Sequence, residues 1–185
     1  MSTIMPAFDK FPKEGSIVGR LLAGYGELEL GLCYCVAVAR DDFDMVFKAM
    51  FRPRGESQRI DIGDALGRQR FETLKLGTQF SEAVASTRHC LKMRNQYAHC
   101  YWTDDFGRKL GFVELEETAK NNSLVDNVFH IKPRDLDISF LEKQEAYFLY
   151  TRDCLDVLQK RAERTAAKKP ILLPPFPKKV RRPTP

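Results

Sequence analysis

The chain of 185 residues is 43% hydrophobic and 30% charged, which is typical of a soluble globular protein long enough for one well-buried core. No apolar run approaches the roughly 18 residues of a membrane-spanning helix. Asp9 and Pro12 lie where a secretory signal needs an apolar core. These features argue against membrane and secreted proteins, and we expect a cytoplasmic protein that contacts no membrane.

The five cysteines are odd in number and show no repeated C-x2-C spacing (Cys33, Cys35, Cys90, Cys100 and Cys154). This pattern indicates reduced thiols rather than disulfides. It also gives no zinc signature, and we expect neither a metal nor a cofactor.

The net charge of +5 is unevenly distributed along the chain. Residues 160–185 contain nine basic residues and one acidic residue, whereas residues 1–159 contain 21 basic and 24 acidic residues, a balance of −3. The basic character therefore belongs to the C-terminal tail, which argues against a nucleic-acid platform over the whole surface.

In chain order, residues 1–15 have few periodic apolar positions and are expected to form an N-terminal arm. A long helix is predicted from Ser16, its N-cap, to about Arg40, because apolar residues recur with the 3.6-residue period of a helix. Glu29 lies within the apolar face of this helix. A charge in that position needs a partner.

A second helix is predicted from an N-cap at Asp41 or Asp42 to about Phe51. Its expected inner side carries Phe43, Val46, Phe47 and Met50. A third helix is predicted from about Ser57, and Gly77 is expected to end it.

The next helix is predicted from about Thr78, and the pattern of apolar residues changes after Trp102. Residues 101–131 predict a small β element, with a hairpin whose turn is formed by residues 104–107. Val128, Phe129 and Ile131 are expected to add one more short strand. This β element would form a lip over the end of the preceding helix.

A last long helix is predicted from about Arg134, and residues 166–185 read as an extended tail rich in Pro, Lys and Arg. The predicted fold is mainly α, an antiparallel up-down helical bundle over residues 16–165 with a small β-hairpin insertion after the helix that begins near Thr78.

That helix carries the residues that point to chemistry. At about 100° per residue, its apolar stripe consists of Phe80, Ala83, Val84, Thr87, Cys90, Leu91, Tyr97, Ala98 and Tyr101. Arg94 falls inside the stripe, where a cation is costly unless it is paired. Asn95 and His99 lie one turn apart along its edge. A fixed cation, a base that titrates near neutral pH and a gap between them would suit a phosphate.

The segment Arg94-Asn95-x-x-x-His99 resembles the R-(polar)-x-x-x-H signature of the HEPN superfamily, small helical proteins that include many metal-independent endoribonucleases. With Tyr101 it also resembles the R-x4-H-x-Y form of HEPN toxins in toxin–antitoxin pairs. The resemblance implies an HEPN-like bundle and motifs that meet across a homodimer cleft. It also implies that an antitoxin can nucleotidylate Tyr101.

Metal-independent cleavage of RNA needs a base for the 2′-hydroxyl, an acid for the leaving 5′-oxygen and a cation for the phosphorane charge. His99 suits either proton transfer, and Arg94 suits the cation. Asn95 would orient His99 or the phosphate, and Tyr101 would donate to the phosphate. Because one chain supplies one such histidine, we expect a homodimer. Glu29 is expected to pair with Arg94 and set its guanidinium in position.

The resulting expectation is a metal-independent endoribonuclease of HEPN type, such as a toxin or a phage-defence nuclease, with RNA and an antitoxin or regulatory protein as partners. The basic tail would add sequence-independent RNA affinity. The alternative is a non-catalytic HEPN-like module that dimerises and binds a nucleotide or a protein, with Arg94 and His99 in structural roles. A further alternative is that the tail docks onto a partner.

Overall fold

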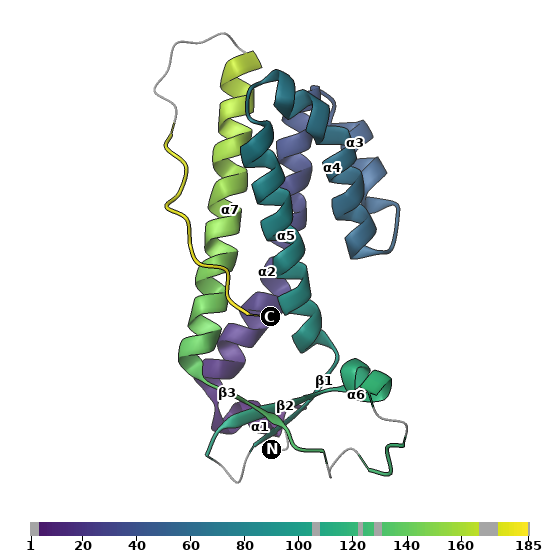
Figure 1. The fold of residues 1–185 in the computed structure, drawn as a ribbon, viewed down its shortest axis with the longest axis vertical. Coiled ribbons are helices and arrows are strands. Elements are labelled where there is room, and N and C mark those ends of the chain that lie inside the picture. The colour runs from purple at the N-terminus through teal and green to yellow at the C-terminus, as the bar shows by residue number, and fades with distance from the viewer. Residues whose placement is uncertain (1–3, 105–107, 122–123, 128–130, 167–173, 185) are drawn as a thin grey trace. The chain divides into compact units, whose positions relative to one another are not determined.

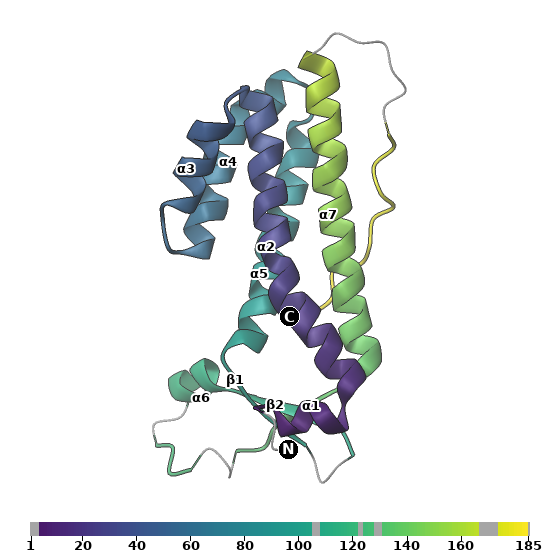
Figure 2. The ribbon, with the colours of Figure 1, turned by 180° about the vertical axis from the view of Figure 1, so that it is seen from behind.

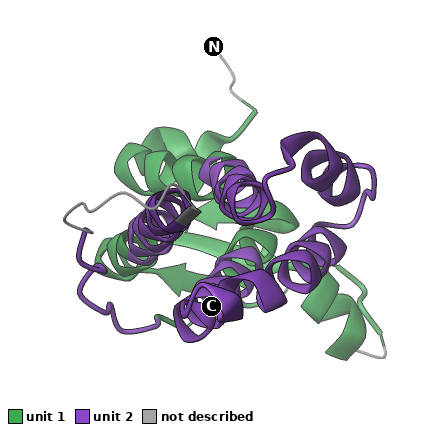
Figure 3. Cartoon of the chain, turned by 90° about the horizontal axis from the view of Figure 1, so that it is seen from above, with its two compact units in different colours: residues 1–23, 92–146, 183–185 green, residues 24–91, 147–182 purple. Residues whose placement is uncertain are grey.

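The computed structural model describes residues 4–104, 108–121, 124–127, 131–166 and 174–184. The chain divides into two compact units (Figure 3). The first unit comprises residues 1–23, 92–146 and 183–185, and the second comprises residues 24–91 and 147–182. The sequence pattern predicts a single domain over residues 16–165, whereas the unit boundaries fall within three of the long helices.

The described chain is mainly helical, with a small antiparallel sheet, as predicted (Figure 1). The helices are α1 (Pro6–Lys10), α2 (Pro12–Arg40), α3 (Phe43–Phe51), α4 (Glu56–Thr73), α5 (Gly77–Ala98), α6 (Leu115–Asn121) and α7 (Ile138–Ala166). The strands are β1 (Cys100–Asp104), β2 (Leu110–Glu114) and β3 (Arg134–Leu136). The specific HEPN arrangement stays a prediction.

The second unit is built from long helices that lie side by side. Within it α2 and α7 run in one direction and α5 runs in the opposite one (Figures 1 and 2). Its core includes Tyr25, Leu28, Leu32, Met50, Ile60, Phe71 and Phe80, each no more than 2% exposed. Burial of such apolar surface is the main driving force for packing these helices.

Helix α4 packs closely on its neighbours through two glycines one turn apart. A Cβ added at Gly63 would lie 3.2 Å from side-chain carbons of both Leu32 and Met50. A Cβ at Gly67 would lie 3.0 Å from Cε1 of Phe80 and closer still to Cζ of that ring. The Phe80 ring has little room to move, because it stacks on Phe71 at a centroid distance of 4.3 Å.

We expect Gly67→Ala to lower the free energy of unfolding by about 1–3 kcal/mol, because the new methyl group overpacks a buried contact. Gly26→Ala is the matched control, since a Cβ there meets nothing within 4 Å. It should raise the free energy of unfolding by about 0.4–1 kcal/mol, because alanine lowers the conformational entropy of the unfolded chain. Urea unfolding of both variants would test this, and equal effects at the two sites would contradict it.

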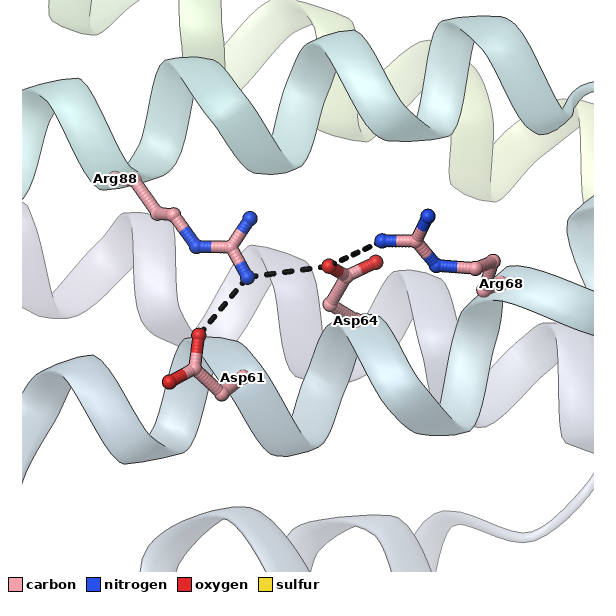
Figure 4. Close-up of polar contacts among 4 residues, drawn as sticks. All are labelled: Asp61, Asp64, Arg68 and Arg88. Atoms are coloured by element: carbon pink, nitrogen blue, oxygen red, sulfur yellow. Dashed lines mark hydrogen bonds and ion pairs between the residues drawn. The ribbon is translucent and has the colours of Figure 1, made fainter.

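A carboxylate buried on the α4 side of the α4–α5 contact joins two arginines (Figure 4). Asp64 is 7% exposed, and its Oδ2 accepts hydrogen bonds from Arg68 at 2.7 Å and from Arg88 at 3.1 Å. Arg88 also donates to Oδ1 of Asp61 at 2.9 Å. Asp64 Oδ1 is buried without a hydrogen-bond partner among the described residues. The cluster therefore fixes α4 against α5 through charge-assisted bonds that are partly open to water.

Asp64→Ala should lower the free energy of unfolding by about 1–2 kcal/mol. The loss is no larger because both arginines are partly exposed, and water screens their attraction to Asp64. Asp61→Ala removes an exposed partner of the same arginine, and its effect should stay within about 0.5 kcal/mol. Thermal or urea unfolding distinguishes the two variants. A loss at Asp61 as large as that at Asp64 would show that burial does not set the strength of this cluster.

Helix α3 follows its predicted cap but not its predicted inner face. Asp42 is the N-cap and accepts a hydrogen bond from the backbone N–H of Met45 at 3.0 Å. Val46 and Met50 are buried as expected, but Phe43 and Phe47 are 44% and 41% exposed. They stack in a row with Tyr34 and Phe51, with centroid distances of 4.9–5.5 Å. Mutual stacking of the rings replaces burial in the core.

In the first unit, the predicted hairpin is present as β1 paired antiparallel with β2. The third strand is Arg134–Leu136, later in the chain than predicted. Val128 and Phe129, expected in that strand, lie outside the described residues, and Ile131 is not in a strand.

The inner face of the hairpin carries an aromatic cluster. Trp102 contacts Tyr97, Phe112 and Phe8 at centroid distances of 5.8, 5.7 and 5.0 Å. Phe8 belongs to α1, so the N-terminal residues form a short helix on β1, where the sequence analysis expected only an arm. Lys10 of α1 also pairs with Asp104.

Residues 174–184 of the tail are extended and contact the helices within each unit. In the second unit, Arg161 donates to the carbonyl of Pro174 at 2.7 Å and lies over the ring of Phe176 at 4.3 Å. In the first unit, Gln144 links the tail to α5, because it donates to the carbonyl of Thr184 at 3.2 Å and accepts from the Tyr97 hydroxyl at 2.6 Å. This part of the tail is therefore docked.

Helix α2 is long and apolar enough to cross a membrane by length and composition, although the sequence analysis expected no such segment. Half of its most apolar window is buried within the structure. Buried core helices of soluble proteins meet the same criterion, so this is weak evidence for a membrane span.

Candidate functional site

The candidate site lies in the first unit, where α5 ends and the hairpin begins. Helix α5 ends at Ala98, His99 makes the turn and Cys100 starts β1. The backbone carbonyl of His99 accepts a hydrogen bond from the N–H of Leu115 at 3.2 Å. This bond ties the turn to the residue that follows β2.

A cavity of about 460 Å³ opens at this turn. Its lining comes from α5 and the turn, the end of β2, the start of α6 and β3: Lys92, Asn95, Gln96, His99, Glu114, Glu116, Glu117 and Arg134. Such a volume is within the range of small-molecule and nucleotide sites. All of these residues belong to the first unit.

The structure places two of the three predicted catalytic residues at this cavity. Asn95 and His99 are both exposed and line it from successive turns. Arg94 is half-buried and is not among the described residues that line the cavity. Its Nη1 donates to the Asn95 Oδ1 at 3.1 Å, so the cation is one hydrogen bond away from the lining.

The two predicted supporting residues lie elsewhere. Tyr101 is 38% exposed on β1, where it pairs with Val113, and it is not among the described residues that line the cavity. Glu29 is 5% exposed in the second unit and accepts a hydrogen bond from Arg59 Nη1 at 3.0 Å. The predicted pair of Glu29 with Arg94 would join the two units and stays a prediction.

Sequence reasoning missed the residues that the hairpin brings to the cavity. Glu114 stands opposite Cys100 in the β1–β2 register, and Arg134 enters from β3. The hairpin was predicted, but counting outward from a turn at residues 104–107 would pair Cys100 with Gly111 instead of Glu114. The sequence contains no comparable signal for the position of β3, because a long segment separates β3 from β2.

On the acidic side of the cavity, the pKa of Glu114 is shifted by its surroundings. Burial raises the pKa of Glu114 above its ordinary range, and a hydrogen bond with Glu117 and the nearby negative charges of Glu117 and Glu116 raise it further. Arg134 opposes this shift; it contacts Glu117 at 2.6 Å and Glu114 at 3.7 Å. Glu114 therefore holds its proton more tightly than an exposed carboxyl group.

Cys100 follows His99 directly, yet the arrangement does not favour a thiolate nucleophile. The thiol of Cys100 donates a hydrogen bond to the backbone carbonyl of Gln96. Burial and the charge of Glu114 raise the pKa of this thiol to about 12. A nucleophilic cysteine requires a lowered pKa, so Cys–His chemistry of the protease type is disfavoured.

Native Cys100 should therefore react slowly with iodoacetamide near pH 7, and its alkylation should accelerate steadily as the pH rises toward the thiol pKa. A thiol reacts through its thiolate form, and little thiolate exists at neutral pH when the pKa is this high. Peptide mass spectrometry would follow the modification, with Cys100→Ser as the control. Rapid alkylation at pH 7 would contradict the raised pKa.

Among residues 4–104, 108–121, 124–127, 131–166 and 174–184, no group of three or more His, Cys, Asp or Glu side chains could hold a metal ion. The arrangement instead offers proton transfer, through His99 and the glutamates, and hydrogen bonding from Lys92, Asn95 and Arg134.

Comparison with protein-family models, with curated protein sequences and with solved structures finds no match for this chain.

Proposed function

We propose that the protein is a metal-independent endoribonuclease of HEPN type that acts in the cytoplasm as a homodimer, for example as a toxin or in phage defence. The observation that carries this proposal is the placement of His99 and Asn95 at one cavity, with Arg94 hydrogen-bonded to that asparagine. A base and a cation placed near the end of one helix are two of the groups that cleavage of RNA through its 2′-hydroxyl requires.

In this proposal His99 takes the proton of the 2′-hydroxyl and Arg94 stabilises charge on the phosphate. Asn95 positions Arg94 by accepting a hydrogen bond from its guanidinium group. Lys92 and Arg134 add positive charge at the cavity wall. Basic residues of the docked tail, such as Lys179 and Arg182, would strengthen sequence-independent binding of RNA.

A second candidate function is favoured by the charges of the cavity. Its lining contains three glutamates against two basic side chains, and Arg94 is not part of it among the described residues. Such a site suits a cationic or hydrogen-bonding ligand better than a bare polyanion. The second candidate is the non-catalytic dimerisation module that binds a nucleotide or a protein, and the acidic lining favours a basic segment of a protein as its ligand.

The test is cleavage of a labelled single-stranded RNA in EDTA by the wild type, Arg94→Ala and His99→Ala. We expect cleavage by the wild type that leaves a 2′,3′-cyclic phosphate, and a loss of about 10²–10⁴-fold in both variants, because each removes a group that acts in the transition state.

Arg152→Ala is the control for a lost surface arginine, since Arg152 on α7 is exposed and pairs with its neighbour Asp153. It should cleave like the wild type. A wild type that cuts nothing, or variants of Arg94 and His99 that cut as fast as the wild type, would favour the non-catalytic module.

A further inference from the structure

The hairpin brings a carboxyl group to the same cavity as His99 within a single chain. Glu114 ends β2 opposite Cys100, and His99 directly precedes Cys100. Side chains alternate along a strand, so Glu114 shares the face of Cys100 and Phe112, which is turned toward α5. Both Glu114 and His99 line the cavity.

The groups around Glu114 raise the pKa of its carboxyl group on balance. Burial raises its pKa, and Glu117 and Glu116 on α6 act in the same direction, whereas Arg134 on β3 opposes them. Among the described residues, other titratable neighbours are Cys100 on β1, Lys92 on α5 and His99 in the turn after α5. A carboxyl group acts as a general acid only in its protonated form, and a raised pKa widens the pH range in which that form is present.

One polar side chain of the cavity lining has an atom without a partner. Gln96 is 9% exposed and lines the cavity, yet its Oε1 is buried with no hydrogen-bond partner among the described residues. A buried acceptor without a partner is costly. A turn of this side chain would expose Oε1 to the cavity, where a donor on a bound molecule, such as a ribose hydroxyl or a base amino group, would satisfy it.

We propose that Glu114 is the general acid that protonates the leaving 5′-oxygen, so that His99 and Glu114 of one chain supply both proton transfers of RNA cleavage. This inference rests on the proposed ribonuclease function. It changes one element of the sequence-based expectation, in which the acid and the base would come from the histidines of two chains.

The step balances within the cavity. The 2′-oxygen forms a bond to phosphorus as its proton passes to His99, and the bond from phosphorus to the 5′-oxygen breaks as that oxygen takes the proton of Glu114. The products are a 2′,3′-cyclic phosphate and a 5′-hydroxyl. His99 is left protonated and Glu114 ionised, and proton exchange with water restores both.

The first test compares the pH dependence of RNA cleavage by the wild type, Glu114→Gln and Glu114→Asp. A general acid acts only below its pKa, so the wild-type rate should fall as the pH rises through the pKa of Glu114. Glu114→Gln should lose about 10²–10⁴-fold in kcat together with this alkaline decline. Glu114→Asp should keep part of the activity, and Glu142→Gln, an exposed control on α7, should match the wild type.

The free energy of unfolding of Glu114→Gln distinguishes a role of Glu114 in proton transfer from a purely structural role. A carboxyl group whose pKa is raised on folding makes the folded state less stable above its unfolded pKa. Glu114→Gln should therefore unfold at neutral pH no more easily than the wild type, while losing activity. If Glu114 served only as the salt-bridge partner of Arg134, its replacement would lower stability and leave the pH profile unchanged.

A mixing experiment tests whether one chain supplies both groups. Differently tagged His99→Ala and Glu114→Gln chains are co-expressed, and the mixed oligomer is purified through both tags. We expect no recovery of activity, because each chain then lacks one group of its own cavity. Recovery would show that the acid and the base come from different chains and would overturn this arrangement.

The remaining outcomes are also decisive. If the wild type cleaves RNA, His99→Ala does not, and Glu114→Gln keeps the wild-type rate and pH profile, the role of Glu114 is wrong and the ribonuclease stands. If the wild type cleaves no RNA, both proposals fail together.

Discussion

The register of the β1–β2 pair is the constraint on which the candidate site depends. Cys100 pairs with Glu114, and the N–H of Leu115 reaches the carbonyl of His99 just beyond that pair. A slip of one residue would turn Glu114 to the opposite face of the sheet and remove it from the cavity. The inner face therefore has to be fixed, and the cluster of Trp102 and Phe112 against Tyr97 fixes it.

The same pairing accounts for the balance of charge at the turn. Three glutamates would repel a phosphate if all were ionised, and two basic residues would not fully offset them. Burial and the neighbouring glutamates raise the pKa of Glu114, so its negative charge is lost at a higher pH than that of an exposed glutamate. A site with this composition can handle protons and still admit a polar, partly anionic ligand.

The elements that follow from local patterns were largely predictable from the sequence. The period of α2 and α5, the cap at Asp42 and the hairpin after the motif helix all depend on residues close together in the chain. The inner face of α3 was wrong at Phe43 and Phe47, because ring stacking competes with burial. The acidic wall at Glu114 and Arg134 was not predicted, because it depends on strand pairing over longer distances along the chain.

The most direct measurement is an NMR titration of the ¹⁵N-labelled protein with a single-stranded RNA that carries one 2′-deoxy nucleotide at the scissile position, so that it binds without being cut. We predict that the backbone amide signals of Lys92, Asn95, Gln96, His99 and Glu114, and the side-chain amide signals of Asn95 and Gln96, shift together and saturate. Shifts confined to the basic tail, or no saturable shift at the turn, would contradict the claim that this cavity is the site of RNA binding.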